Sequence, residues 1–260
     1  IRAWIGSILE EGKEVCLSPL PMYHIFALAV NFLAMSSLGA KTVLVTNARD
    51  LKSVIKEFKK HPISLMTGVN TLFNALMHND DFKTVDFSPL KVTVGGGMAV
   101  QRSVSESWQQ LTGCPLSEGF GMTETSPATH FNPMSGTKKE GSIGPPWPDT
   151  DAKIVDLEHG TTEMPVGTEG ELVIKGPGIF TGYLGSDEEN RMLVTPDGFL
   201  KTGDLAKVDD AGNFTITGRI KDIIIRGGEN ISAIEVENLV SSHELVEAVA
   251  VIGMPDEELG

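Results

Sequence analysis

The chain has 260 residues, 40% of them hydrophobic and 22% charged, a composition typical of a globular protein with one large or two modest domains. Acidic residues outnumber basic ones by 35 to 21, and the longest basic clusters are Lys59-Lys60 and Lys138-Lys139, which argues against a nucleic-acid-binding surface. No apolar run reaches the roughly 18 residues that a membrane-spanning helix needs. Cys16 and Cys114 lie far apart without disulfide or metal spacing, which fits a reducing cytosol.

The first part of the chain, residues 15–116, alternates short apolar runs with longer amphipathic segments, which predicts an α/β fold with a doubly wound parallel sheet. Gly39 stands where a helix C-cap is favoured, and Asp50 is expected at the N-terminus of the next helix. Strands are expected near residues 15–18, 42–46, 63–67, 91–94 and 115–118, and helices near residues 25–38, 50–60, 69–78 and 100–112.

Polar residues and glycines follow four of these expected strands. His24 comes after the first strand, Gly68 after the third, Gly95 to Gly97 after the fourth, and residues 120–124 after the fifth. Ligands of open α/β sheets bind beyond the carboxyl ends of the strands, so these groups predict one common crevice. Two alternatives stay open: a histidine whose ring is satisfied by backbone at a helix start, and glycines that only form a turn.

The stretch of residues 118–125 has the composition of a nucleotide site. Its glycines let backbone approach a ligand closely, and Phe120 can stack on a base. Thr123 can hydrogen-bond an anionic oxygen, and Glu124 can hold a hard divalent cation against phosphate. Taken alone, the same residues would also suit a tight connection between a strand and a helix, because short glycine-rich motifs have a real false-positive rate.

The character of the sequence changes after residue 137, where glycine, proline and β-branched residues become frequent. A small antiparallel, barrel-like or sandwich-like β subdomain is expected to follow the α/β part, with strands over residues 152–157, 170–175, 201–208 and 213–217. A third unit should contain strands over 223–226 and 247–252, a loop over 227–230 and a helix over 233–242. The predicted division is therefore 1–137, 138–220 and 221–260, the last being the start of a small α+β domain.

Several motifs occur together in one order along the chain. They are Leu20-Pro21-Met22-Tyr23-His24-Ile25-Phe26-Ala27-Leu28, Thr67-Gly68-Val69-Asn70-Thr71-Leu72-Phe73-Asn74-Ala75-Leu76, Gly95-Gly96-Gly97-Met98-Ala99, Gly119-Phe120-Gly121-Met122-Thr123-Glu124-Thr125, Gly170-Glu171-Leu172-Val173-Ile174-Lys175-Gly176, Phe199-Leu200-Lys201-Thr202-Gly203-Asp204 and Gly218-Arg219-Ile220-Lys221-Asp222. This series resembles the adenylate-forming superfamily of acyl-CoA synthetases, beetle luciferases and adenylation domains. Within that superfamily the chain is most similar to bacterial long-chain fatty-acid–CoA ligases.

The resemblance implies an ATP-dependent, AMP-forming ligase reaction in two halves. A fatty-acid carboxylate attacks the α-phosphorus of ATP, giving acyl-adenylate and pyrophosphate. The thiol of coenzyme A then takes the acyl group and AMP leaves. The implied cofactors and substrates are ATP or AMP, Mg²⁺, coenzyme A and a fatty acid of medium or long chain.

The resemblance also implies roles for individual residues. Glu124 would hold Mg²⁺, and Thr123 would contact the α-phosphate. The remaining roles fall into three groups: adenine and ribose contacts for Gly95, Gly96, Gly97, Gly119, Phe120, Gly121, Asp204, Ile216 and Arg219; substrate contacts for His24, Val69, Met98 and Ala99; and a hinge at Lys221. From the residues alone, Asp204 could equally be a turn aspartate and Arg219 half of a surface ion pair.

Some family features are expected outside residues 1–260, namely the loop that grips the outer phosphates and the near-terminal catalytic lysine. The chain is therefore interpreted as a central excerpt that is inactive alone. Leu28 stands near the position where some long-chain enzymes carry a gating tryptophan, which leaves the acyl-chain length open. Ala233 stands near a position where many relatives have proline, which weakens the match there.

Two other functions stay open. One is an adenylation enzyme for an aryl or amino acid, although apolar Val69, Leu72 and Phe73 occupy a region where amino-acid activators usually place an acidic residue. The other is a non-catalytic nucleotide-binding module. We expect a cytoplasmic protein without nucleic-acid partners, and leave open peripheral contact with the inner face of the membrane and a homodimer.

Overall fold

The computed structural model describes residues 5–133, 139, 141–227, 229–241, 243, 245–246 and 249–256. The chain divides into two compact units, Ile1–Gly141 and Ser142–Gly260. The predicted boundary between residues 137 and 138 lies outside the described residues, and the division into three parts stays a prediction. Among the described residues, no helix combines the length and the hydropathy that crossing a bilayer requires.

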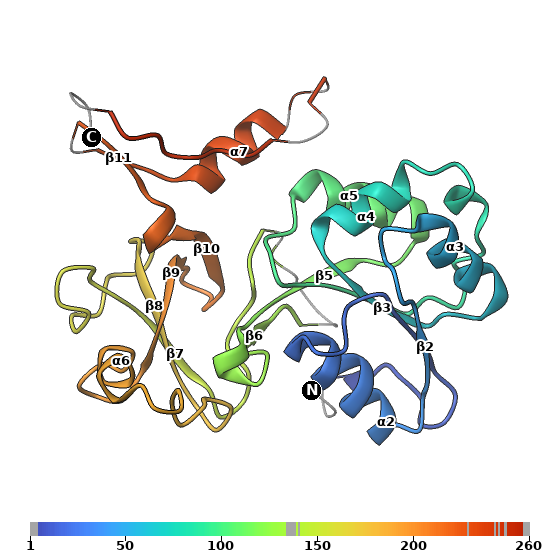
Figure 1. Ribbon diagram of the computed structural model, residues 1–260, viewed down its shortest axis with the longest axis horizontal. Helices are drawn as coiled ribbons and strands as arrows, with labels where there is room; N and C mark the ends of the chain where they lie inside the picture. The colour runs from blue at the N-terminus through green and yellow to red at the C-terminus, as the bar shows by residue number, and fades with distance from the viewer. Residues whose placement is uncertain are drawn as a thin grey trace. The chain divides into compact units, whose positions relative to one another are not determined.

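The first unit is built on a six-stranded sheet with the order β2-β1-β3-β4-β5-β6 (Figure 1). The four neighbouring pairs from β2 to β5 are parallel, and β6 joins β5 antiparallel. The predicted doubly wound parallel sheet is confirmed, with the short edge strand β6 added. The strands are β1 Val15–Ser18, β2 Lys41–Leu44, β3 Leu65–Gly68, β4 Val92–Gly95, β5 Leu116–Phe120 and β6 His130–Phe131.

Three amphipathic helices pack on the sheet and bury one apolar face each. These are α3 Leu51–Lys60, α4 Asn70–Met77 and α5 Arg102–Thr112, and Figure 1 shows α4 beside α5. Their core includes Phe73 and Phe82, whose ring centroids lie 4.8 and 5.7 Å from that of Trp108. The predicted end signals are also confirmed: Asp50 Oδ1 accepts the N–H of Ser53 at 3.3 Å, and Gly39 has the positive φ of a C-cap.

The predicted helix over residues 25–38 has a different backbone. Ala27–Ala34 forms the π-helix η1, and only Met35–Ser37 continues as α2. A buried asparagine sits in η1: Asn31 Nδ2 donates to Ser18 Oγ at 2.9 Å and to Thr67 Oγ1 at 2.8 Å. These bonds tie η1 to β1 and β3, near the carboxyl ends of both strands. The periodicity of apolar residues in a sequence cannot show such a polar contact. π-Helices are rare overall, and those that occur often lie at functional sites.

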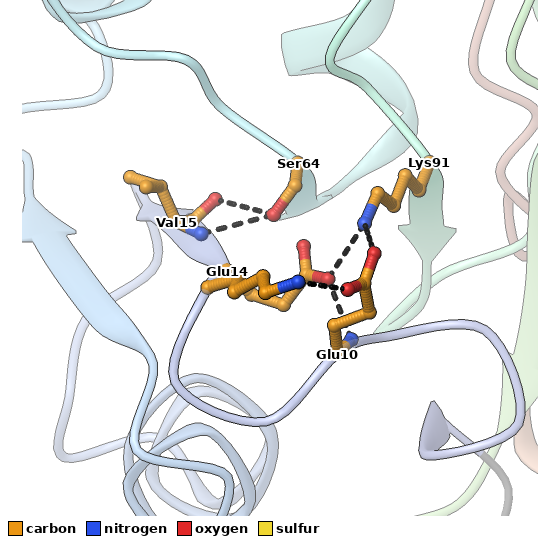
Figure 2. Close-up of polar contacts among 6 residues, drawn as sticks. Glu10, Glu14, Val15, Ser64 and Lys91 are labelled. Carbon is orange, nitrogen blue, oxygen red and sulfur yellow. Dashed lines mark hydrogen bonds and ion pairs between the residues drawn. The ribbon is translucent and has the colours of Figure 1, made fainter.

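A charged cluster fastens the opposite, amino-terminal edge of the sheet (Figure 2). Glu14 is almost fully buried, and its Oε1 accepts from Lys91 Nζ at 2.8 Å and from the backbone N–H of Glu10 at 2.7 Å. Burial raises the pKa of Glu14, but these hydrogen bonds and the lysine charge outweigh it and hold the pKa below its usual value. Next to this cluster, Ser64 Oγ accepts the N–H of Val15 at 2.9 Å. The cluster therefore joins the starts of β1, β3 and β4.

The second unit contains a four-stranded antiparallel sheet with the order β10-β9-β8-β7. The predicted antiparallel β-rich region is confirmed, as a single sheet in place of the expected barrel or sandwich. Its strands are β7 Asp151–Val155, β8 Gly170–Lys175, β9 Leu200–Val208 and β10 Phe214–Arg219, and the short helix α6 spans Asp187–Met192. The aliphatic side chains of both strands are buried: Leu172, Val173 and Ile174 on β8, and Leu200, Leu205 and Ala206 on β9.

The last segment differs from its prediction at two places. A hairpin of β11 Ile224–Arg226 and β12 Glu229–Ile231 replaces the expected plain loop over 227–230, because residues 229 and 230 pair with β11. The helix α7 spans Ala233–Ser241, close to the predicted bounds. Residues 249–252 form no strand, and the other two residues of the expected strand 247–252 lie outside the described residues.

Candidate active site

The first side chains of the candidate site follow β1. His24 is exposed, and its Nδ1 accepts the backbone N–H of Phe26 at 3.2 Å, so one ring nitrogen is satisfied locally at the start of η1. The ring of Phe26 reaches the glycines that follow β4: a Cβ on Gly96 would lie 3.1 Å from Phe26 Cε1. The backbone contact that the alternative interpretation of His24 expected is therefore present at one ring nitrogen. Phe26 in turn connects His24 to Gly96.

Residues 95–99, here called the glycine segment, form the end of β4 and the turn after it. Gly96 is buried, and its N–H donates to the carbonyl of Gly68 at 3.2 Å, which joins the ends of β3 and β4. Gly97 has φ +79°, which favours glycine, and a Cβ there would lie 3.9 Å from Val69 Cγ1. Met98 is half exposed. The segment therefore offers bare backbone to a ligand beside Val69.

The motif of residues 118–125 continues β5 into a tight turn. A Cβ on Gly119 would lie 2.7 Å from the ring of Phe131, and one on Gly121 would lie 1.7 Å from the carbonyl oxygen of Pro127. Both positions thus require glycine, because the motif packs closely against the residues that follow it, from Pro127 to Phe131. We predicted them as points of ligand approach; the structure supplies this packing reason, which the sequence did not reveal.

Phe120, within the motif, packs against the buried histidine His130. Its ring meets that of His130 edge to face, with centroids 6.0 Å apart, and its carbonyl accepts the N–H of Thr129 at 2.9 Å. Because one side of the ring is supported in this way, Phe120 has a fixed orientation from which to stack on a flat ligand.

Thr123 and Glu124 lie in the 3-10 turn Thr123–Thr125, directly after Phe120 and Gly121. Thr123 is exposed and Glu124 is partly buried, and Thr125 Oγ1 accepts the N–H of Met122 at 2.9 Å to hold the turn. The part of the chain that the structure describes contains no group of three His, Cys, Asp or Glu residues suited to a metal ion. A single carboxylate still fits Mg²⁺, which typically takes one or two carboxylates and completes its shell with water and phosphate oxygens.

In the second unit, the predicted ribose and phosphate contacts lie side by side. Asp204 on β9 pairs with Arg219 on β10 across the strands, and Arg219 Nε lies 3.0 Å from Asp204 Oδ1. Burial raises the pKa of Asp204, and the neighbouring guanidinium opposes that rise. Asp204 is 5% exposed and sits inside a strand, so the alternative of a turn aspartate is wrong, whereas the alternative of an ion pair for Arg219 is confirmed.

Two further predicted residues flank this pair. Ile216 is partly buried on β10 opposite Ala206, and a bulge between Ile216 and Gly218 changes the register before Arg219. Lys221 is exposed in the 3-10 turn Ile220–Asp222 that leaves the sheet. The structure therefore groups His24, Val69 and the glycines in the first unit, and Asp204 with Arg219 in the second.

The buried histidine behind Phe120 gives a testable pH dependence. Burial lowers the pKa of His130 from 6.5 to about 3, so the folded ring stays neutral where the unfolded one takes up a proton. The stability that the neutral ring contributes is complete above pH 6.5 and is lost as the pH falls toward 3, by at most about 1.4 kcal/mol per pH unit. We expect His130→Phe, which keeps the ring contact, to lose less stability than the wild type between pH 6.5 and 5. Urea unfolding at several pH values measures this, and parallel profiles of the two proteins would contradict it.

A family model described as AMP-binding enzyme matches residues 2–184. The chain is 43% identical over 260 residues to the long-chain-fatty-acid–CoA ligase of Escherichia coli, covering all of this chain and 46% of that relative. Its structure is similar to ATP-bound MatB from Rhodopseudomonas palustris, with a TM-score of 0.90 and 27% identity, covering 100% of this chain and 51% of that one. It is also similar to an anthranilate CoA ligase in complex with anthranoyl-AMP, with a TM-score of 0.88 and 26% identity, covering 97% and 48%.

Proposed function

The chain belongs to the AMP-binding enzyme family, and from this premise we propose that the intact protein is an AMP-forming fatty-acid–CoA ligase. The observation that carries the proposal is the 43% identity to a long-chain-fatty-acid–CoA ligase along all 260 residues. The chain spans 46% of that relative's length, so the activity and the substrates are proposed for the intact protein.

Two groups of residues would bind the nucleotide. The ring of Phe120 stacks on adenine beside the bare backbone of Gly96 and Gly97, and Ile216 lines the adenine pocket. The proposal for Phe120 is supported by its fixed, partly buried ring. Asp204 accepts the ribose hydroxyls while Arg219, which already pairs with it, offers its remaining guanidinium N–H groups to ribose or phosphate oxygens.

The phosphate chemistry would fall to the turn after β5. The Thr123 hydroxyl donates to the α-phosphate, and the Glu124 carboxylate is the protein ligand of Mg²⁺, which when bound offsets the charge of the phosphates. The proposal is supported by their position in one turn: Thr123 is exposed and Glu124 follows it directly, shortly after the end of β5. The backbone of this turn is held by the Thr125 hydroxyl, which accepts the N–H of Met122.

The carboxylic substrate would enter beside the glycine segment. His24 lies next to the reacting carboxylate, and Val69 with Met98 and Ala99 surrounds the acyl entrance. Support comes from the contacts that link His24 through Phe26 to Gly96, and from Val69, which lies next to Gly97. Lys221 acts as the hinge, at the exposed turn that follows β10. Coenzyme A is the second substrate and takes the acyl group from the adenylate.

An aryl acid is a second candidate substrate, because the chain is similar in structure to an anthranilate CoA ligase. The structure also weakens one argument against amino-acid activation. Leu72 and Phe73 are 7% and 0% exposed and belong to the core, whereas Val69 lies next to Gly97.

The protein would act in the cytoplasm, with peripheral membrane contact and a homodimer as open proposals.

The test of the proposed function is a pyrophosphate-release and acyl-CoA assay of the intact protein with saturated fatty acids of graded length, benzoate, anthranilate and several amino acids. We expect the highest kcat/KM with a medium- or long-chain fatty acid. A preference for an aryl acid or an amino acid would replace the proposed substrate, and nucleotide binding without any turnover would favour a non-catalytic module.

A further inference from the structure

Two side chains for which the sequence predicted no role hold the backbone that follows the glycine segment. Asn70, the first residue of α4, is 9% exposed, and its Oδ1 accepts the N–H of Gln101 at 3.0 Å. Glu118 on β5 is partly buried, and its Oε1 accepts the N–H of Val100 at 3.0 Å. Two successive backbone N–H groups are thus bound by side chains from two different elements, and neither bond belongs to a helix or a sheet ladder.

The held residues connect the glycine segment to α5. Gln101 is the N-cap of α5, where backbone N–H groups have no partner within the helix. The side chain of Val100 fills the space that Gly95 leaves, since a Cβ on Gly95 would lie 2.5 Å from Val100 Cγ2. Movement of Val100 and Gln101 would therefore move the glycine segment with them.

In sequence, the two holding residues adjoin different groups of the proposed site. Glu118 begins the motif that carries Phe120 and Glu124, whereas Asn70 directly follows Val69 at the proposed acyl entrance. We propose that Asn70 and Glu118 are positioning residues that fix the glycine segment against both the nucleotide side and the carboxylate side. This inference rests on the proposed function for its kinetic consequence, but its structural part is independent of turnover.

The charge of Glu118 is not required for this role. Burial raises the pKa of Glu118 to about 7, although the bond from Val100 opposes the rise. Both the neutral and the ionised carboxyl have an oxygen that accepts a hydrogen bond. A glutamine, which has the same length and one carbonyl oxygen, should therefore retain the contact, whereas alanine removes it. Asp in place of Asn70 likewise keeps an acceptor oxygen of the same reach.

The structural part is tested by amide hydrogen exchange on the ligand-free protein. We expect Glu118→Ala to raise the exchange rate of Val100, and Asn70→Ala that of Gln101, by roughly tenfold or more, because each amide loses its side-chain hydrogen-bond acceptor. Glu118→Gln and Asn70→Asp should restore rates near those of the wild type. Matched controls are Glu106→Gln on the exposed face of α5 and Asn74→Ala one turn further along α4. Unchanged exchange at both amides in the alanine variants would overturn the proposal.

The kinetic part uses the intact protein with ATP and the preferred carboxylic acid. Because the glycine segment faces both substrates, Glu118→Ala and Asn70→Ala should each raise the KM for ATP and the KM for the acid, by roughly 2- to 30-fold, and the conservative variants should reverse both changes. A change confined to one substrate would overturn the coupling. If the intact protein activates no acid at all, the proposed function fails, and the exchange rates still decide whether these residues hold the segment.

Discussion

Replacing Glu124 with glutamine should lower the rate of adenylation by on the order of 10²–10³, with little change in fatty-acid affinity. Glutamine matches the size of the partly buried side chain, so the 3-10 turn Thr123–Thr125 should keep its shape. It removes the negative charge that a hard cation prefers, at the point where charge moves to the leaving pyrophosphate. Pyrophosphate release measured at saturating ATP over a range of Mg²⁺ concentrations gives the rate and the metal dependence together.

The matched control for this variant is Glu158→Gln, which removes one carboxylate charge from an exposed turn of the second unit. It should leave both the rate and the Mg²⁺ dependence unchanged. If Glu124→Gln also shows near-normal turnover and the wild-type Mg²⁺ dependence, Glu124 is not the metal ligand.

The sheet of the first unit could be predicted because its strands are short apolar runs separated by clear end signals. Asp50 and Gly39 mark a helix start and a helix end through local chemistry alone, and both predictions are confirmed. The order of the strands then brought Gly68, Gly95 and Phe120 to the same edge, as the rule for open α/β sheets requires. The candidate site was therefore accessible wherever it depended on chain order.

Contacts between distant side chains could not be predicted in the same way. Asn31 interrupts an apolar run and looks like a weak helix position, yet it is buried and bonded to Ser18 and Thr67. Asn70 and Glu118 sit inside motifs whose neighbours drew the functional interpretation, and their partners are backbone N–H groups that leave no mark in a sequence. Polar contacts of this kind depend on tertiary placement, which periodicity does not encode.

The cross-strand pair in the second unit changes how the ribose prediction must be tested. Asp204 is 5% exposed and forms an ion pair with Arg219, which is half exposed. Removing the Asp204 carboxylate therefore also removes this ion pair. Because the carboxylate of this pair is buried, losing the pair can change stability, whereas an acceptor missing from a bound ribose changes nucleotide binding. Thermal unfolding of Asp204→Ala and Arg219→Ala without nucleotide separates the two effects, and Asp204→Asn keeps the shape of the side chain without its charge.

Asp204→Ala should weaken ATP binding by roughly 1.5–3 kcal/mol, the range for a lost hydrogen bond to a charged group, or about 10- to 150-fold in Kd. A carboxylate has two oxygens that can accept hydrogen bonds from the two neighbouring ribose hydroxyls, whereas the alanine side chain has no acceptor. Calorimetry with the intact protein measures the affinity for ATP and for 2′-deoxy-ATP. The wild type should bind ATP more tightly than 2′-deoxy-ATP, which lacks the 2′-hydroxyl. The variant should bind the two nucleotides with more similar affinities, because it has no acceptor for the 2′-hydroxyl of ATP. Equal affinities in the wild type, together with no effect of the substitution, would remove Asp204 from the site and leave it as the strand partner of Arg219 alone.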